Sequence, residues 1–233
     1  MTLNLWGYTD WNARKDGILN LVTQARADII ALQEVQTNLS FSNSPQSDFI
    51  ASHTNYPYFI FAPSHKKVAQ FDTHSERSQT ASHGLAIISK HPIVSSESYF
   101  LDPQPSHPEP CTVLFCKVEI DGHLIDVCNV HFGNNDVVSD LQIKELITLC
   151  EARNIHPIIL GDFNNFDLSR YKHTALKDYT VSTDITPYVS MPRNNGTLDY
   201  ILAPDGFKIN TVACPKDYVS DHRAVIAELL EIL

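Results

Sequence analysis

The chain has 233 residues, of which 43% are hydrophobic, and a formal net charge of −10 at pH 7. It can bury a substantial core, and because it has no run of about eighteen apolar residues, we expect no stable insertion into a membrane. The negative charge argues against tight, sequence-independent binding to long nucleic acid, but not against an enzyme in which a divalent cation reverses the charge locally.

The start of the chain and its cysteines indicate the compartment. The first ten residues, MTLNLWGYTD, have neither the basic nor the long apolar stretch of a secretory signal. The five cysteines form no CxxC pair, and such a scattered, odd number is typical of reduced, packed thiols. They are Cys111, Cys116, Cys128, Cys150 and Cys214. We therefore predict a cytoplasmic protein; the alternatives are an exported protein with one or two disulfides and a trimmed chain.

Strands and helices alternate through the first part of the chain. A strand is predicted at 2–7, and an amphipathic helix over 12–26, where apolar residues recur at helical spacing. These residues are Ile18, Leu19, Val22 and Ala25. The apolar run at 27–35, ADIIALQEV, predicts a buried strand that carries Gln33 and Glu34 at its end.

The next segment is the least regular and is rich in Ser, Asn, His and Gln. We expect a short helix near 46–53, a strand at YPYFIFAP and a mobile loop around 64–82. The basic residues of this loop either are solvated or contact further phosphates of a substrate. They are Lys66, Lys67 and Arg77.

The remainder predicts further strands and one long helix. GLAIISKHPIV and CTVLFCKVEIDGHLIDVCNVHF are expected strands, the second a hairpin that turns at Asp121-Gly122. Asp136 is expected to cap a helix through about residue 152, with apolar positions at Val137, Leu141, Leu146 and Leu149. HPIIL, GTLDYILAP, FKINTVAC and HRAVIAEL complete the strands. Since no linker divides the chain, we predict one α/β domain over residues 1–233, with two packed sheets and outer helices.

Polar side chains recur where the predicted strands end. They are the carboxylates and amides of Asn4, Glu34, Asp162, Asn164, Asp199 and Asp221, and the imidazoles of His131 and His222. Because strand ends bring distant segments to one cleft, we expect these side chains to converge. Burying so many acids together is costly without a cation, and hard oxygen ligands without cysteine favour Mg²⁺ or Mn²⁺.

Taken singly, each of these residues has an ordinary structural explanation. An Asp-His pair is usually a cap or a surface turn, GDFNN could be a strand followed by an Asx-turn, and His131 alone could be a structural histidine. The functional interpretation depends on all of them occurring in one order along the chain.

That order resembles the endonuclease/exonuclease/phosphatase superfamily, to which deoxyribonuclease I belongs. The match extends from residue 4 to 222 and consists of Asn4, LQEV, NVHF, GDFN, LDYI and SDH. The resemblance implies a four-layer α/β/β/α sandwich of two packed mixed sheets with outer helices. It also implies hydrolysis of phosphate esters with a divalent metal, for which Glu34 is the main ligand and Asn4 and Asp221 contribute nearby or at a second site.

The resemblance also implies roles for the remaining polar residues. Asp162 activates or aligns the attacking water, and Asn164 donates to a phosphoryl oxygen. His131 and His222, the latter oriented by Asp199, stabilise the charge on the phosphate or transfer protons. This division of work suits phosphoryl transfer, which depends on alignment and charge neutralisation more than on covalent chemistry.

The sequence departs from the family pattern in two places. Many relatives carry an arginine just before the strand that leads to the NVHF histidine, whereas SHPEPCTVLF has none; His107 or Lys117 could replace it. The residues around the GDFN acid differ from the signature of the inositol polyphosphate 5-phosphatases, which makes inositol polyphosphates a weaker candidate.

Three functions follow from these observations. The first is a Mg²⁺-dependent phosphodiesterase acting on nucleic acid, short, single-stranded or end-modified in view of the acidic surface. The second is a sphingomyelinase-like or other small-molecule phosphodiesterase or phosphatase. The third is an inactive binding module, which the complete set of site residues disfavours. The oligomeric state is not predicted.

Overall fold

The computed structural model describes residues 1–38, 42–68, 80–108 and 110–232. The first half contains β1 (Thr2–Asn4), α1 (Trp11–Ala25), β2 (Ile29–Asn38), β3 (Ser42–Pro45), α2 (Gln46–His53), β4 (Tyr58–Val68), β5 (Thr80–Ser89), β6 (Ile93–Phe100) and β7 (Thr112–Ile120). The second half contains β8 (His123–His131), α3 (Asp136–Ala152), β9 (Ile158–Asp162), β10 (Tyr179–Val181), α4 (Ser182–Ile185), β11 (Asp199–Pro204), β12 (Phe207–Ala213) and β13 (Ile226–Glu231). Single 3-10 turns lie at Ser169–Tyr171 and Pro192–Asn194.

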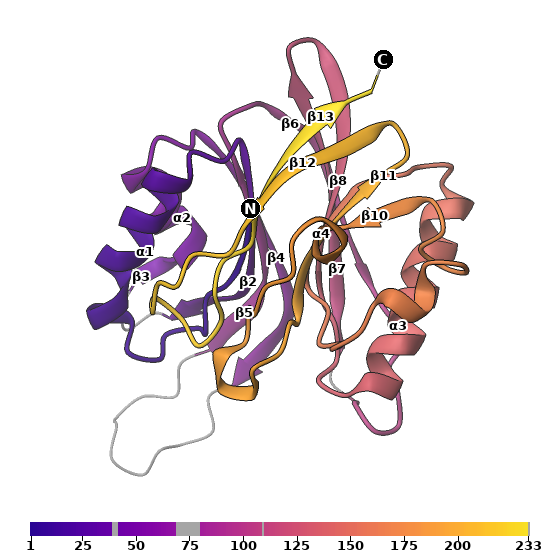
Figure 1. Ribbon diagram of the computed structural model, residues 1–233. Helices are drawn as coiled ribbons and strands as arrows, with labels where there is room; N and C mark the ends of the chain where they lie inside the picture. The colour runs from indigo at the N-terminus through magenta and orange to yellow at the C-terminus, as the bar shows by residue number, and fades with distance from the viewer. Residues whose placement is uncertain (39–41, 69–79, 109, 233) are drawn as a thin grey trace.

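Two large mixed sheets form the centre of the molecule. In the described residues, one sheet has the strand order β1-β2-β5-β4 with β3 paired to β2, and the other has the order β10-β11-β9-β8-β7-β6. The pairs β1–β2 and β8–β9 are parallel, whereas the other pairs within these sheets are antiparallel. Strands β12 and β13 form a separate ribbon that crosses between the sheets in Figure 1.

Helices cover the outer face of each sheet. Figure 1 shows α1 and α2 on one side of the molecule and α3 on the other. Apolar clusters fill the three spaces between these layers, with Leu32 under α1, Leu114 between the sheets and Phe132 under α3 as representatives. This arrangement confirms the predicted sandwich of two sheets with outer helices.

The predicted long helices are present, but the cap of α3 and two of its four predicted apolar positions, Val137 and Leu141, differ in the structure. Asn135, not Asp136, caps α3, because its side chain accepts a hydrogen bond from the Val138 N–H at 3.0 Å. Val137 is 68% exposed, and the buried apolar positions of the helix include Val138 and Leu146. The difference arises because Ser139 and Gln142 also face inward. The Ser139 hydroxyl accepts from Asn165 at 2.9 Å, and Gln142 Oε1 accepts from the Gly133 N–H at 2.8 Å.

Strand β2 does not end at Gln33 and Glu34 as predicted. It continues to Asn38, and its register against β5 shifts between Leu32 and Val35. Glu34 has a φ of 51°, in the left-handed region. An extra residue on one strand of an antiparallel pair is a β-bulge, and a bulge changes the direction of a side chain without ending the strand.

The remaining differences concern turns. The hairpin turn at Asp121-Gly122 is confirmed, with φ values of 50° and 85° that suit a type I′ turn. GLAIISKHPIV divides into β5 and β6 near Pro92, which cannot donate to a strand ladder. Both ends of the segment predicted as a loop at 64–82 are strand, because β4 reaches Val68 and β5 begins at Thr80. Residues 69–79, with Arg77, and the side chains of Lys66 and Lys67 lie outside the described part of the chain.

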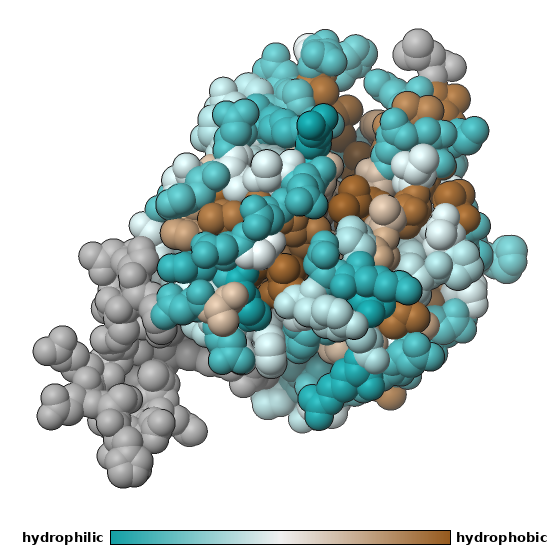
Figure 2. Space-filling model, turned by 60° about the vertical axis from the view of Figure 1, so that its left-hand side comes forward, coloured by the Kyte–Doolittle hydropathy of each residue, from teal (hydrophilic) through white to brown (hydrophobic). Residues whose placement is uncertain are grey.

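A cavity of about 860 Å³ opens between the sheets at the ends of the strands remote from the polar motifs. Apolar residues of the strand starts line it, among them Ile29, Ile125 and Ile158. Figure 2 shows a largely hydrophilic face on which apolar side chains appear in hollows. In the described part of the chain, no helix combines the length and the hydropathy needed to cross a bilayer.

Candidate active site

The sheet topology brings four of the predicted site residues to one rim. Asn4 ends β1, His131 ends β8 and Asp162 ends β9. The parallel register of β8 and β9 sets His131 beside Asp162, and the antiparallel register of β9 and β11 sets Asp199 on the other side of Asp162. Strand pairing thus makes neighbours of His131, Asp162 and Asp199, and Asn4 joins them from the other sheet through its bond to Asp162.

Asp162 lies at the centre of this group and is 1% exposed. Its Oδ1 accepts the Asn164 N–H at 2.9 Å, and its Oδ2 accepts from Asn4 Nδ2 at 3.1 Å. The same Oδ2 lies 3.6 Å from His131 Nε2 and 3.8 Å from His222 Nε2. These two separations exceed hydrogen-bond length, so neither imidazole bonds directly to this carboxylate oxygen.

Asp199 and His222 form a buried hydrogen-bonded pair. His222 Nδ1 and Asp199 Oδ2 are 2.8 Å apart, and both residues are buried. Burial lowers the pKa of His222, but the charges of Asp199, Asp162 and Asp221 and the hydrogen bond to Asp199 outweigh this effect and raise the pKa to about 10. Burial also raises the pKa of Asp199. The hydrogen bond to Asp199 therefore fixes the His222 ring with its Nε2 toward Asp162.

Glu34 joins the group through Asn4. Asn4 Nδ2 donates to Glu34 Oε1 at 3.1 Å as well as to Asp162, and Asn4 Oδ1 accepts the Trp6 N–H at 3.0 Å. One amide therefore bridges carboxylates from the two sheets. The β-bulge turns the Glu34 side chain toward this rim, whereas in a regular strand it would follow the alternation of β2.

Asp221 and Arg14 lie close to the same carboxylates. Arg14 is buried, which lowers its pKa, while the charges of Asp221, Asp10 and Glu34 act in the opposite direction. Arg14 donates to the carbonyl oxygens of Leu5 at 3.0 Å and Val219 at 2.7 Å. It thereby ties the loop after β1 to the segment that leads to Asp221.

Asn164 and His131 occupy the open side of the site. Asn164 Nδ2 donates to the Phe132 carbonyl at 2.8 Å, which leaves its second amide proton for another acceptor. His131 is partly exposed, with 21% of its side chain accessible. The ring of His83, which the sequence reasoning did not single out, lies 6.3 Å from that of His131.

Two further buried residues hold the site and were missed in the sequence. Ser190 Oγ accepts the N–H groups of Leu198 at 3.0 Å and Asp199 at 3.1 Å, and so fixes the start of β11. Arg14 stands four residues before Ile18 on the buried stripe of α1. A charge on an apolar helix stripe could have identified Arg14, whereas a serine in a loop gives no such signal.

Two exposed aromatic rings lie on the loops that carry Asn164 and Asp221. Phe166, two residues after Asn164, is 51% exposed and packs against Gly196, where an added Cβ would lie 2.5 Å from the ring. Tyr218, three residues before Asp221, is 80% exposed, and the Arg223 guanidinium lies 6.0 Å from the centre of its ring. The loops that carry the site residues therefore present two flat apolar surfaces and a cation.

His107 and Lys117, the two residues that could replace the arginine of the family pattern, differ in their position relative to the site. Lys117 lies away from the rim, because it pairs with Asp126 at 2.6 Å along the β7–β8 hairpin. The ring of His107 borders Gly133, two residues beyond His131, where an added Cβ would lie 3.2 Å from it. Of the two residues, His107 is the one near the site.

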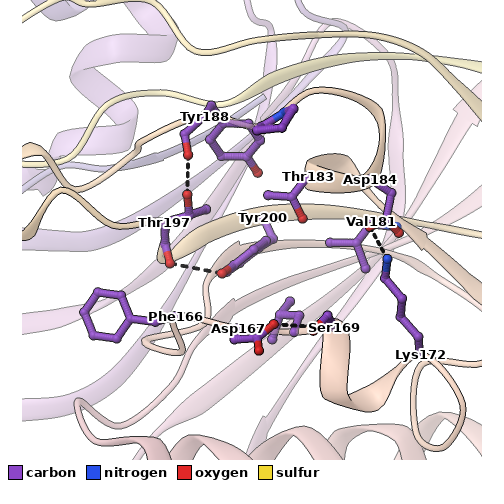
Figure 3. A pocket seen from close by; sticks show the side chains of 12 residues that line it. Phe166, Asp167, Ser169, Lys172, Val181, Thr183, Asp184, Tyr188, Thr197 and Tyr200 are labelled. Carbon is purple, nitrogen blue, oxygen red and sulfur yellow. Dashed lines mark hydrogen bonds and ion pairs between the residues drawn. The ribbon is translucent and has the colours of Figure 1, made fainter.

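A smaller cavity of about 230 Å³ adjoins the site (Figure 3). Its charged side chains are paired: Lys172 with Asp184, and Asp167 with the Ser169 N–H at 2.9 Å. Tyr188 connects the wall of the cavity to the site, because its hydroxyl donates to the Asp199 carbonyl at 2.9 Å. The cavity therefore lies behind the strand that carries Asp199.

The donor set fits a hard divalent cation. Carboxylates of Glu34, Asp162, Asp199 and Asp221 gather with the Asn4 amide, and oxygen donors of this kind suit Mg²⁺ or Mn²⁺. Ligand atoms of Asp162, Asp199 and His222 also lie within 4.8 Å of one another. In that second group, however, Asp199 and His222 already bond to each other.

The comparisons with known proteins agree on fold and family. A sequence profile described as the Endonuclease/Exonuclease/phosphatase family matches residues 1–222. No curated protein matches the chain.

Solved structures with a similar fold include an endonuclease/exonuclease/phosphatase from Beutenbergia cavernae DSM 12333, at 17% identity over 93% of this chain and 66% of that chain, with a TM-score of 0.76. The human Nocturnin catalytic domain with bound sulfate anion is 17% identical over 95% of this chain and 87% of that chain, with a TM-score of 0.71. Sphingomyelinase C from Streptomyces griseocarneus is 17% identical over 97% of both chains, with a TM-score of 0.63. At these identities the likeness shows the fold alone.

Proposed function

The chain belongs to the endonuclease/exonuclease/phosphatase family of phosphoester hydrolases, and from this premise we propose that it is a Mg²⁺- or Mn²⁺-dependent phosphodiesterase acting on nucleic acid. One observation carries the proposal. Oδ2 of the buried Asp162 lies between two imidazoles, at 3.6 Å from His131 and 3.8 Å from His222, and accepts from the amide of Asn4. This arrangement gathers around one carboxylate oxygen the donors and acceptors that phosphate hydrolysis requires.

Glu34 is the main metal ligand in this proposal, with Asn4 and Asp221 nearby. When bound, the cation neutralises charge on the phosphate and lowers the pKa of a coordinated water. Asn4 keeps Glu34 and Asp162 at a fixed separation by donating to both. Arg14 holds the backbone next to Asn4 and shortly before Asp221, because it donates to the carbonyls of Leu5 and Val219.

The chain's own groups align the reactants. Asp162 orients the attacking water through Oδ2, and the second amide proton of Asn164 is donated to a phosphoryl oxygen. His222, held by Asp199, presents a protonated Nε2 that stabilises developing charge or gives a proton to the leaving oxygen. His131, on the open side, binds the substrate phosphate. Losing one such preorganised donor typically costs about 2.7–4 kcal/mol of barrier.

The flanking aromatic rings support nucleic acid as the substrate. Bases stack on aromatic side chains without regard to sequence, and Arg223 adds a positive charge beside Tyr218. With a net charge of −10, we infer a short, single-stranded or end-modified strand rather than a long duplex. We place the enzyme in the cytoplasm, because all five cysteines, which lie in the described ranges, are free thiols.

A substrate screen tests the proposal. Purified protein is incubated with Mg²⁺, Mn²⁺ or EDTA and with single-stranded DNA, RNA, 5′-tyrosyl oligonucleotides, sphingomyelin, sugar phosphates and bis(p-nitrophenyl) phosphate, with His222→Ala as the matched inactive control. We expect metal-dependent cleavage of one or more nucleic acids, abolished by EDTA and by the variant. If the protein cleaves only sphingomyelin or sugar phosphates, nucleic acid is not its substrate, and the cleaved class takes its place in the proposal. No turnover on any substrate would favour a binding module.

A further inference from the structure

A second buried amide, besides that of Asn4, connects the two sheets near the site. Asn129 lies on β8 and is fully buried. Its Nδ2 donates to the carbonyls of Leu32 on β2 at 3.0 Å and Ala86 on β5 at 2.8 Å. Its Oδ1 accepts from Gln33 Nε2 at 2.7 Å. One side chain of the second sheet thus bonds to two adjacent strands of the first.

These contacts surround the bulge that carries Glu34. Leu32 pairs with Ala86, and Val35 pairs with Gly84, so Gln33 and Glu34 together face a single residue of β5. Asn129 donates to the carbonyls of Leu32 and Ala86, the last regular pair before the bulge. It also accepts from the side chain of Gln33, the first residue of the bulge. Thr2 Oγ1 donates to Gln33 Oε1 at 3.2 Å and completes the network from β1.

The backbone of Glu34 needs such support. Its φ of 51° lies in the left-handed region, which is sterically unfavourable for a residue with a side chain. A conformation of this kind persists when its surroundings leave no alternative, and it is often found at functional sites. If the strand were regular, Glu34 and every residue after it would alternate to the other face of the sheet.

We propose that Asn129 is a positioning residue that stabilises the β2 bulge and thereby directs the Glu34 carboxylate toward the bound cation. This inference rests on the proposed function, in which Glu34 is the metal ligand. Asn129 lies two residues before His131 on β8, and side chains two apart share a face of a strand. The amide therefore also sets the spacing between the strand of His131 and the strand of Glu34.

Metal binding, measured without turnover, tests the inference. Mn²⁺ affinity is determined by calorimetric titration of metal-free protein for the wild type, Asn129→Ser and Asn129→Leu. Val118→Ala, a truncation in the same apolar layer on β7, is the matched control for general loss of stability. Circular dichroism and thermal unfolding report whether each variant is folded at the temperature of the titration.

We expect the two Asn129 variants to bind Mn²⁺ at least tenfold more weakly than the wild type, with excess metal restoring part of their turnover. Val118→Ala should lose stability and keep its affinity. Affinities of folded Asn129 variants within twofold of the wild type would overturn the inference. So would loss of the fold in both Asn129 variants, because the residue would then serve the whole sandwich rather than the bulge.

The wild type and Glu34→Gln separate this failure from that of the proposed function. If the wild type binds no Mn²⁺, or binds it equally well with Glu34→Gln, the metal role of Glu34 is wrong and both proposals fall. If Glu34→Gln abolishes binding while the Asn129 variants bind normally, only the role of Asn129 is wrong.

Discussion

His222 Nδ1 and Asp199 Oδ2 share a hydrogen bond of 2.8 Å between two buried residues. In Asp199→Asn the charge that supports the imidazolium is lost, so the pKa of His222 should fall and its orientation should loosen. We expect kcat to decrease by about 10²–10⁴-fold, the usual contribution of general acid–base catalysis. Hydrolysis of bis(p-nitrophenyl) phosphate measures the effect, with Asp205→Asn in an exposed turn as the control. Near-native turnover of Asp199→Asn would contradict the assignment.

Glu34→Gln removes one charge from the carboxylate group while keeping its shape. In the proposed site the cation binds mainly through this charge, so we expect Mn²⁺ to raise the melting temperature of the wild type but not that of the variant. We expect turnover to fall by about 10²-fold or more, as after loss of a preorganised group. Glu119→Gln, an exposed glutamate on β7, is the control and should behave as wild type. Equal stabilisation of both variants by Mn²⁺ would show that the cation binds elsewhere.

Arg14→Met leaves buried carbonyls without their donor. Arg14 bonds the carbonyls of Leu5, Gly7 and Val219 at 2.7–3.1 Å. Since hydrogen bonds to charged groups contribute about 1.5–3 kcal/mol each, we expect a loss of at least about 2 kcal/mol in the free energy of unfolding. Urea denaturation measures it, and the neighbouring Lys15→Met should change stability little. A variant as stable as the wild type would mean that water replaces the guanidinium.

Gly161→Ala tests the close approach of β8 and β9. An added Cβ would lie 2.1 Å from the Val130 carbonyl oxygen, and the φ of 149° is one that side-chain residues rarely adopt. Because the atoms that the Cβ meets are backbone, β8 and β9 must move apart, which displaces Asp162 beside Gly161; we expect destabilisation of about 3 kcal/mol or more with loss of activity. Gly206→Ala also has a positive φ, of 96°, but meets nothing within 4 Å. It should cost roughly 1–2 kcal/mol, so the difference between the variants isolates the clash.

The buried thiols predict a dependence of stability on alkaline pH. Burial raises the pKa of Cys116 and of Cys150 to about 12. Because a free thiol titrates near about 8.5, these groups contribute their full stability below that pH and lose it progressively as the pH rises toward 12. Urea unfolding at pH 7 and pH 10 should show the loss, and Cys116→Val should reduce it. Rapid labelling of Cys116 by a thiol reagent in the folded protein at pH 8 would contradict this assignment.

The sequence allowed the strands, the helices and the meeting of the polar motifs to be predicted. Asn4, His131 and Asp162 each directly follow an apolar run, and strand ends converge in a packed sheet. The hairpin at Asp121-Gly122 was identifiable because its turn chemistry is local. Features that depend on a few adjacent residues were therefore accessible.

Features set by long-range register were not accessible. The bulge at Glu34 exists only relative to β5, about 50 residues later, so LQEV appeared to end a strand. The orientation of α3 depends on the partners of Ser139 and Gln142, and apolar spacing alone favoured Val137. Asn129 in NVH gave no sign of its bonds to Leu32 and Ala86, because a buried asparagine is recognised by its surroundings.

The bond between Asn4 and Asp162 joins positions 158 residues apart. During synthesis the first strand must therefore wait for most of the polypeptide to leave the ribosome, and the SDH segment emerges later still. Contacts of such sequence separation form slowly, after much loop-closure entropy has been lost. A nascent chain that is still growing therefore cannot assemble this site, and phosphoesterase activity can arise only after the SDH segment has left the ribosome.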